Sequence, residues 1–146
     1  MKKDKIIVAV SGGFDPIHVG HLEMFEHAKK LGDHLVVILN NDNWLIKKKG
    51  FVFMPAEQRK TLTEALRCVD EVVITEHGPD PKDMSVAETL AKVRPHIFAN
   101  GGDRKKGNTP EGQVAKKLNI KMIFNIGGGK TQSSSWLLGD FLNKHT

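Results

Sequence analysis

The sequence lacks most of what disulfide-rich, secreted and membrane-spanning proteins require. Its 146 residues include a single cysteine, Cys68, which excludes an intrachain disulfide framework and is typical of a reducing compartment. No apolar run approaches the roughly 20 residues that span a bilayer. The apolar run after the basic residues 1–5 is too short for a secretory signal. We therefore expect a cytoplasmic protein without a membrane partner.

Aromatic residues are also scarce, at 6% of the chain with no tyrosine. Few rings are available to stack on nucleic-acid bases, and no nucleic-acid-binding module is recognisable. The net charge of +5 nevertheless favours anionic partners. Small phosphorylated ligands fit both observations, so we expect no nucleic acid. An RNA-binding protein that uses the basic runs 47–49 and 104–106 is the rival hypothesis, which a steep salt dependence of oligonucleotide binding would support.

Short apolar segments alternate with segments of helical periodicity along the chain. Strands are expected at 6–10, 34–40, 71–75, 96–100 and 121–126, and helices at 22–31, 55–69, 85–94, 109–119 and 133–143. Helix starts are indicated by Pro55, by a capping box from Ser85 to Glu88, and by Thr109 before a proline. Residues 41–52 are polar and are expected to form a loop. The alternation predicts an α/β three-layer Rossmann-like domain with a five-stranded parallel sheet, with 1–146 as a single domain.

The glycine- and histidine-bearing run from Gly12 to His21 lies between the first strand and the first helix. Helix N-termini present free N–H groups and a positive dipole end, and glycines let the backbone approach phosphate oxygens. His18 and His21 stand three apart, so both face one side of a helical first turn and are able, when protonated, to donate to one phosphate. The run therefore predicts an anion site. Zinc is the alternative, but no third or fourth ligand is evident nearby.

Four informative loops are expected at one edge of the sheet. They are Gly12–His21, Asn40–Lys49, Asn100–Arg104 and Gly127–Ser135. In a parallel α/β sheet, ligands bind beyond the carboxyl ends of the strands, where each of these loops begins. The sequence therefore predicts that the loops converge on a single site.

The motif from Gly13 to His21 resembles the H-x-G-H signature of the cytidylyltransferase-like nucleotidyltransferase superfamily. Three further segments, 30–37, 55–59 and 69–73, resemble one branch of it. That branch contains glycerol-3-phosphate cytidylyltransferases and the adenylyltransferase domain of heptose-phosphate enzymes. The resemblance covers nearly the whole chain.

The resemblance implies a magnesium-assisted transfer of CMP or AMP, from CTP or ATP, to a phosphorylated sugar or polyol, with release of pyrophosphate. It also implies a homodimer. A pantetheine-phosphate-type adenylyltransferase is an alternative, but the arginine that follows the serines in that branch is absent after Ser135. The arginine of the cytidylyltransferases' R-T-x-G segment is also missing. Lys130 stands near its place as a point charge, so ATP is as plausible as CTP. A non-catalytic nucleotide-binding regulator of the same fold is the remaining alternative.

The resemblance also assigns roles to residues of this chain. The catalytic set is His18, His21, Lys48 and Arg59, with Lys47 or Lys49 taking the place of Lys48 after a small shift. The nucleotide-binding set is Gly12, Gly13, Phe14, Asp15, His18, Gly20, His21, Lys48, Gly101, Gly102, Asp103, Lys130, Thr131, Gln132, Ser133, Ser134 and Ser135. No metal ligand is expected from the protein other than Asp15. The sequence leaves three roles open for Asp15, namely orienting a histidine, coordinating magnesium and capping the turn.

Structural roles compete with several of these assignments. The lysine run from Lys47 to Lys49 is equally consistent with an exposed loop, and Arg59 with a carboxylate partner on its own helix. The sequence Gly101–Asp103 is typical of a tight turn, and Ser133–Ser135 of a helix cap.

Overall fold

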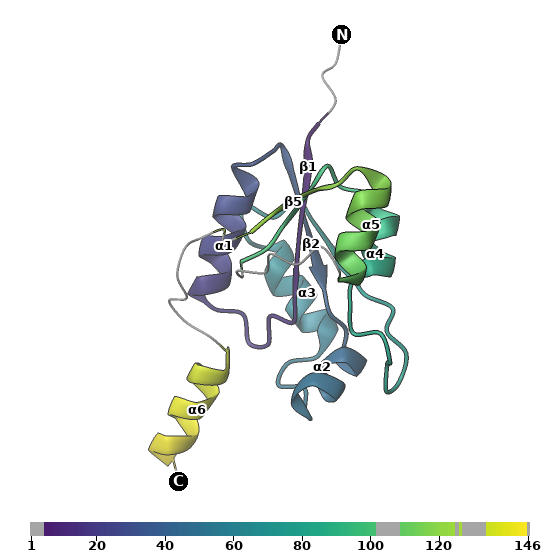
Figure 1. Ribbon diagram of the computed structural model, residues 1–146. Helices are drawn as coiled ribbons and strands as arrows, with labels where there is room; N and C mark the ends of the chain where they lie inside the picture. Colours follow the sequence, from purple (N-terminus) through teal and green to yellow (C-terminus); the bar gives the residue numbers. More distant parts are fainter. Residues whose placement is uncertain (1–4, 102–108, 125, 127–133, 146) are drawn as a thin grey trace.

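A parallel sheet with helices on both faces positions the candidate site residues of the first strand and the first three helices (Figure 1). The computed structural model describes residues 5–101, 109–124, 126 and 134–145. Its strands are β1 (Ile7–Gly12), β2 (His34–Leu39), β3 (Glu71–Ile74), β4 (Ile97–Ala99) and β5 (Lys121–Ile123). Its helices are α1 (Val19–Lys29), α2 (Asp42–Lys49), α3 (Ala56–Glu64), α4 (Ala87–Val93), α5 (Pro110–Leu118) and α6 (Ser134–His145).

The strand order β3-β2-β1-β4-β5 confirms the five-stranded parallel sheet. The chain lays down β1, β2 and β3 toward one edge and then returns to add β4 and β5 on the other side of β1. The order therefore reverses between β1 and β4. Ligands of open α/β sheets bind in the crevice at such a reversal, outside the carboxyl ends of the strands. Gly12 and Asn100 mark this place, at the ends of β1 and β4.

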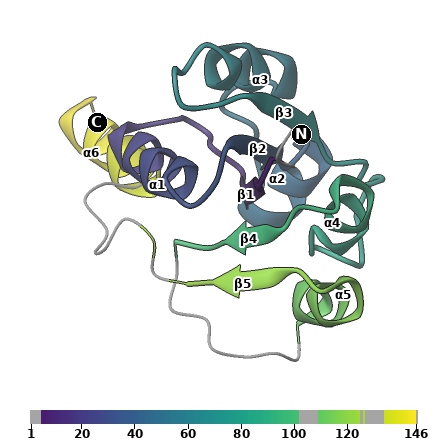
Figure 2. The same cartoon turned by 90° about the horizontal axis from the view of Figure 1, so that it is seen from above.

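Figure 2 shows from above that α1 and α3 lie on one face of the sheet and α4 and α5 on the other. The two faces bury separate cores. On one face, Val8 and Val10 pack with Phe25 of α1 and with residues beside α3. On the other face, Ala9 packs with Leu90 of α4 and with residues of α5. Because both faces of β1 and β2 are covered, their sequences are continuous apolar runs rather than alternating ones.

The segment after β2 is a helix, so the loop predicted at 41–52 is wrong. Asn41 caps α2 by accepting from the Trp44 N–H at 3.0 Å, and Gly50 ends it with a φ of 86°. The last turn holds three lysines, which complement the negative end of the helix dipole. Apolar periodicity is weak across Asp42–Lys49, so the capping residues and the terminal charges were the only helix signal.

Other element boundaries differ from the predictions by a few residues. The capping box at Ser85 is wrong, because α4 begins at Ala87 with Val86 as its N-cap, while Ser85 Oγ accepts from the Ala87 N–H at 3.3 Å. The Thr109 cap is confirmed by the hydrogen bond from Gly112 N to Thr109 Oγ1 at 3.0 Å. Among the helices that the structure describes, none is long and apolar enough to cross a bilayer.

Candidate functional site

The turn after β1 needs glycine because other side chains press against its backbone. A Cβ atom at Gly12 would lie 2.8 Å from the Phe14 ring. A Cβ atom at Gly13 would lie 3.0 Å from Leu45 Cδ2 of α2. The Asn40 N–H donates to the Gly12 carbonyl at 2.9 Å, so the ends of β1 and β2 are joined at this turn. The glycine turn is thus packed directly against the start of α2.

His18 and His21 form a reciprocal cap at the N-terminus of α1. His18 is the N-cap residue, and its Nδ1 accepts from the Gly20 N–H at 3.1 Å. His21 Nδ1 accepts from the His18 N–H at 3.2 Å. The two rings stack with centroids 3.7 Å apart and an interplanar angle of 22°. The sequence prediction that both rings lie on one side of the first turn is therefore confirmed.

The cap determines which nitrogen of each ring carries the proton. A ring nitrogen that accepts a backbone N–H cannot itself be protonated, so in each neutral ring the proton is on Nε2. Nδ1 and Nε2 lie on opposite sides of an imidazole. Each ring therefore turns Nδ1 to the backbone and carries its N–H donor on the side away from it.

His21 is neutral at physiological pH. Burial, the neighbouring His18 and the Lys49 ammonium together lower the pKa of His21 from 6.5 to about 3. Phe14 contributes to the burial, because its ring meets the His21 ring edge-on with centroids 4.8 Å apart. The protonated form considered from the sequence is therefore not the form that His21 takes at this pH. His21 has a single N–H to offer a phosphate, on Nε2.

Acidification below pH 6.5 is expected to destabilise the protein through His21. The unfolded chain protonates this residue near pH 6.5, whereas the folded chain resists protonation down to about pH 3. Because the unfolded state binds more protons in this window, His21 lowers the free energy of unfolding by up to about 1.4 kcal/mol per pH unit. Chemical denaturation of the wild type and of His21→Gln at pH 7 and pH 4.5 measures the effect. Equal acid sensitivity of the two proteins would contradict it.

Asp15 has a structural role. Its side chain is 1% exposed, and its two carboxylate oxygens accept from the Phe53 and Met54 N–H groups, each at 2.7 Å. The carboxylate thereby fastens the α2–α3 connection to the glycine turn. These contacts favour a structural role for Asp15 over orienting a histidine or ligating magnesium.

The Arg59 side chain is buried and joins several backbone segments through hydrogen bonds. Its side chain is 0% exposed. Its guanidinium donates to the Gly13 and Asn40 carbonyls, each at 2.7 Å, and to the Met54 carbonyl at 2.8 Å. A fourth bond runs to Asp42 Oδ1 at 2.6 Å. Four of the five N–H groups are therefore used within the protein, which favours a structural role for Arg59 over the catalytic one.

The lysines of α2 differ in their surroundings. Lys47 pairs with Asp80 at 2.5 Å, on the loop after β3. Lys48 is exposed. Lys49 is half-buried, and its charge acts on His21. Of the three alternatives at this position, Lys49 is the one whose charge acts on His21.

The loop after β4 reaches the same edge of the sheet. A Cβ atom at Gly101 would lie 2.9 Å from Met24 Sδ, so this loop lies close against α1. The structure therefore brings Gly12–His21, the start of α2 and Asn100–Gly101 together. The remaining candidates, Gly102, Asp103, Lys130, Thr131, Gln132 and Ser133, lie outside the described residues. Of Ser134 and Ser135, only the backbone is described, at the start of α6.

Two asparagines at this edge were not among the site residues predicted from the sequence. Asn40 follows β2 and Asn100 follows β4, on either side of β1. Asn40 Oδ1 and Asn100 Nδ2 are buried and have no hydrogen-bond partner among the residues that the structure describes. Buried polar atoms of this kind are uncommon, and a ligand or water normally satisfies them. The sequence signal that could have identified them is a polar residue directly after each of two buried strands.

Comparison with known proteins gives a family and two groups of relatives. Residues 9–129 match the family model described as cytidylyltransferase-like. The FAD synthase of Pyrococcus abyssi is 42% identical over 101 residues, which are 68% of this chain and 65% of that protein. The bifunctional protein HldE of Pelobacter propionicus is 37% identical over 118 residues, 80% of this chain and 22% of that protein. The chain thus spans just under two thirds of the first relative's length and about a fifth of the second's.

Solved structures share the fold. A lipopolysaccharide core biosynthesis protein from Thermoplasma volcanium superposes with a TM-score of 0.70 and 27% identity, covering 88% of this chain and all of that one. A pantoate-beta-alanine ligase from Francisella tularensis gives a TM-score of 0.55 over 85% of this chain. At 16% identity, the second comparison concerns the fold alone.

Proposed function

This chain belongs to the cytidylyltransferase-like family, and from that premise we propose that it transfers AMP or CMP from ATP or CTP to a phosphorylated sugar or polyol. An oxygen of the acceptor phosphate attacks the α-phosphorus. The bond from this phosphorus to the β-phosphate oxygen breaks, and pyrophosphate leaves. No side-chain nucleophile takes part, so the protein acts by aligning two anions and stabilising the charge that develops between them.

The paired histidines carry this proposal. They stand at the N-terminus of α1, where backbone N–H groups and the helix dipole already favour an anion. The reciprocal cap holds both rings in one orientation before any ligand arrives, with Nε2 protonated in each neutral ring. Fixed donors of this kind stabilise a transition state better than mobile ones, because they need no reorganisation during the reaction.

In the proposed reaction, magnesium is bound by the nucleotide and not by a side chain of the protein. Among the residues that the structure describes, no three His, Cys, Asp or Glu side chains are grouped to hold a metal ion. Asp15, the side chain considered for this role, uses both oxygens on backbone N–H groups. The described residues therefore do not fit a protein-held magnesium, and none of the steps proposed here depends on one.

A second candidate acceptor is FMN. The observation that favours it is the 42% identity to an FAD synthase, because FAD consists of AMP joined to FMN. The similarity to HldE favours a sugar phosphate instead, in line with the heptose-phosphate enzymes that the sequence resembles. Both candidates share a phosphomonoester as the attacking group.

The test is a pyrophosphate-release screen. The four nucleoside triphosphates are each combined with glycerol 3-phosphate, a heptose phosphate, other sugar phosphates and FMN. Release with ATP or CTP and a sugar or polyol phosphate supports the proposal, and release with FMN alone moves the acceptor to the second candidate. A protein that binds ATP but releases no pyrophosphate with any acceptor would instead be a non-catalytic regulator. The homodimer and the cytoplasmic location remain parts of the proposal, and light scattering tests the first.

Lys49 rather than Lys48 is expected to be the phosphate-binding lysine of α2. Its charge acts on His21, whereas Lys48 is exposed. Removing a charged hydrogen-bond donor from a phosphate costs about 1.5–3 kcal/mol, so Lys49→Met is expected to lower kcat/KM roughly 10- to 150-fold. The matched variant Lys48→Met is expected to change it less than about threefold. Steady-state kinetics decide, and a larger loss in Lys48→Met would contradict this assignment.

A further inference from the structure

The side chain of Trp44 contacts two segments that lie far apart in the sequence. Trp44 belongs to the first turn of α2 and is half-buried. A Cβ atom at Gly13 would lie 3.2 Å from Trp44 Cζ3, so the six-membered ring of the indole packs against the glycine turn after β1. At the opposite edge of the indole, Nε1–H donates to the Met84 carbonyl at 2.8 Å, in the segment between β3 and α4. One side chain therefore bridges the two segments.

We propose that Trp44 is a positioning residue, which fixes the segment between β3 and α4 relative to the glycine turn and so aligns the two substrates. This role rests on the nucleotidyl transfer proposed above. In that reaction the attacking oxygen, the α-phosphorus and the leaving oxygen must lie in line, and a misplacement of about 1 Å costs about 100-fold in rate. A contact that spans both segments therefore acts on kcat.

The glycine turn is the nucleotide side of this bridge. It leads directly into the N-terminus of α1, where His18 and His21 stand. The Arg59 guanidinium also holds the turn, by donating to the Gly13 carbonyl at 2.7 Å. The turn is thus fixed by a hydrogen bond to its backbone and by the packing of the Trp44 ring. A nucleotide that binds at the turn restrains this ring as well.

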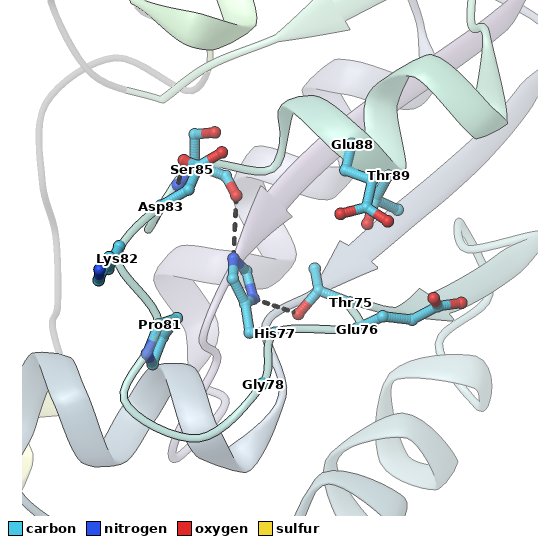
Figure 3. A pocket seen from close by; sticks show the side chains of 10 residues that line it. All are labelled: Thr75, Glu76, His77, Gly78, Pro81, Lys82, Asp83, Ser85, Glu88 and Thr89. Atoms are coloured by element: carbon cyan, nitrogen blue, oxygen red, sulfur yellow. Dashed lines mark hydrogen bonds between the residues drawn. The ribbon is translucent and has the colours of Figure 1, made fainter.

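The segment between β3 and α4 is the other side of the bridge, and its own hydrogen bonds brace it. Figure 3 shows the His77 ring between Thr75 and Ser85, with Nδ1 2.8 Å from Thr75 Oγ1 and Nε2 2.9 Å from the Ser85 carbonyl. A carbonyl oxygen only accepts, so Nε2 carries the proton and Nδ1 accepts from the Thr75 hydroxyl group. Met84 directly precedes Ser85. The indole is therefore bonded to a segment that is already held together.

The two sides of the bridge lie close to each other at the carboxyl edge of the sheet. The braced segment borders a cavity of about 240 Å³ beyond the end of β3. In the sheet, β2 alone lies between β3 and β1, which carries the glycine turn. Two strand spacings of about 4.8 Å therefore separate the ends of β3 and β1. A second substrate beside the nucleotide has the segment that Trp44 holds among its surroundings.

Other hydrogen bonds between α2 and this segment do not involve the glycine turn. The side-chain amides of Asn41 and Asn43 both donate to the His77 carbonyl at 2.8 Å. They fasten α2 to the segment, whereas Trp44 also packs on Gly13. An indole is rigid and has two rotatable bonds, so a shift at one of its edges reaches the other. The bridge is therefore a property of Trp44 rather than of α2 as a whole.

The variant Trp44→Phe breaks the bridge and keeps an aromatic side chain. Phenylalanine has no N–H, and its single ring is too short to reach both segments. The matched control is Asn43→Ala, which removes a hydrogen bond of the same 2.8 Å length from the same helix to the same segment. In that variant the His77 carbonyl keeps the Asn41 amide as its partner.

Trp44→Phe is expected to lower kcat about 10- to 100-fold with the acceptor found in the pyrophosphate screen, because alignment is lost rather than binding. The KM values of nucleotide and acceptor are expected to stay within about threefold of the wild type, the pattern of an interaction that acts only in the transition state. Asn43→Ala is expected to change kcat less than about threefold, because no buried acceptor loses its last partner. Unchanged kcat in Trp44→Phe, or an equal loss in both variants, would overturn the inference.

Hydrogen exchange tests the bridge without any acceptor. The probe is α,β-methylene-ATP, from which pyrophosphate cannot be released. In the wild type, the analogue is expected to slow amide exchange at residues 83–86 by at least about fivefold, because the bridge passes the restraint from the glycine turn to this segment. In Trp44→Phe the slowing is expected at residues 12–21 alone. Absence of slowing at residues 83–86 in the wild type, or equal slowing there in Trp44→Phe, would overturn the inference.

The two measurements separate this inference from the proposed function. A wild type that releases pyrophosphate while Trp44→Phe keeps full kcat leaves the transfer standing and removes the positioning role. A wild type that binds the analogue with slowed exchange at residues 83–86, but releases no pyrophosphate with any acceptor, supports the bridge and contradicts the transfer.

Discussion

Replacing Arg59 by methionine is expected to lower the free energy of unfolding by about 3–5 kcal/mol, the largest stability effect that we expect from a single substitution. The guanidinium is fully buried and is bonded to the carbonyls of Gly13, Asn40 and Met54 and to the Asp42 carboxylate. Methionine fills much of the same volume without a donor. The substitution therefore leaves carbonyl oxygens from three segments without the partner that satisfies them, and their desolvation is no longer compensated.

Chemical denaturation followed by circular dichroism measures this loss. Arg67→Met is the matched control, because Arg67 is exposed in the turn after α3 and its substitution is expected to change stability by less than about 0.5 kcal/mol. If Arg59→Met unfolds at the same denaturant concentration as Arg67→Met, the buried Arg59 side chain is not a stabilising element. A normally stable Arg59→Met protein with reduced nucleotide affinity would restore the phosphate-binding role that the buried geometry contradicts.

Replacing His21 by alanine is expected to lower kcat by about 100- to 1,000-fold, the loss typical of removing one preorganised donor from a developing charge. The neutral imidazole of His21 offers a single N–H, on Nε2, and the cap holds it in a fixed orientation. Removing the ring withdraws that donor from the N-terminus of α1, where we propose that the phosphates bind. Steady-state kinetics with the acceptor found in the screen measure the loss, and a variant with more than about a tenth of wild-type kcat would contradict this role.

The variant His21→Gln distinguishes the helix-capping role of His21 from its proposed catalytic role. In an ordinary capping box, a glutamine at the third helical position accepts from the N-cap N–H, as His21 Nδ1 does from His18 N. We therefore expect His21→Gln to retain wild-type stability at pH 7, whereas His21→Ala loses about 1 kcal/mol with the cap. Both variants are expected to lose most of the activity. Full activity in His21→Gln would mean that the ring acts only by shaping the helix terminus.

Much of the fold was predictable because buried parallel strands have an unambiguous pattern. The strands around Val8, Val37 and Val72 are short β-branched or apolar runs bounded by turn residues, and all of them form. The helix at Asp42–Lys49 was missed because it buries a single residue, Leu45, and so has almost no apolar periodicity. Its stability comes from the Asn41 cap, the lysines of its last turn and its contacts with neighbouring loops. Hydrophobic periodicity in a sequence indicates a helix with a buried face, and α2 buries too little of its surface to produce that pattern.

The candidate site was predictable in part, for a related reason. His18, His21 and the glycine turn are adjacent in the sequence, so their geometry follows from one strand-to-helix junction. Arg59 and Asp15 are distant from their partners in the sequence, and Arg59 stands 46 positions after Gly13. A charged residue in a ligand-binding motif is as consistent with holding the backbone as with holding the ligand. Only burial distinguishes the two, and burial is a property of the folded chain.

The sequence by itself determined the alternation of elements, the parallel sheet and the strand-to-helix junction that carries both histidines, because each rests on spacing along a local stretch of chain. The tertiary structure decided which groups are exposed to a ligand. It buried Arg59 and Asp15 on backbone groups, made His21 neutral through Phe14, His18 and Lys49, and brought the charge of Lys49 to act on His21. These outcomes depend on dielectric environment and on contacts between distant segments, and neither is encoded in the spacing of residues along a single element.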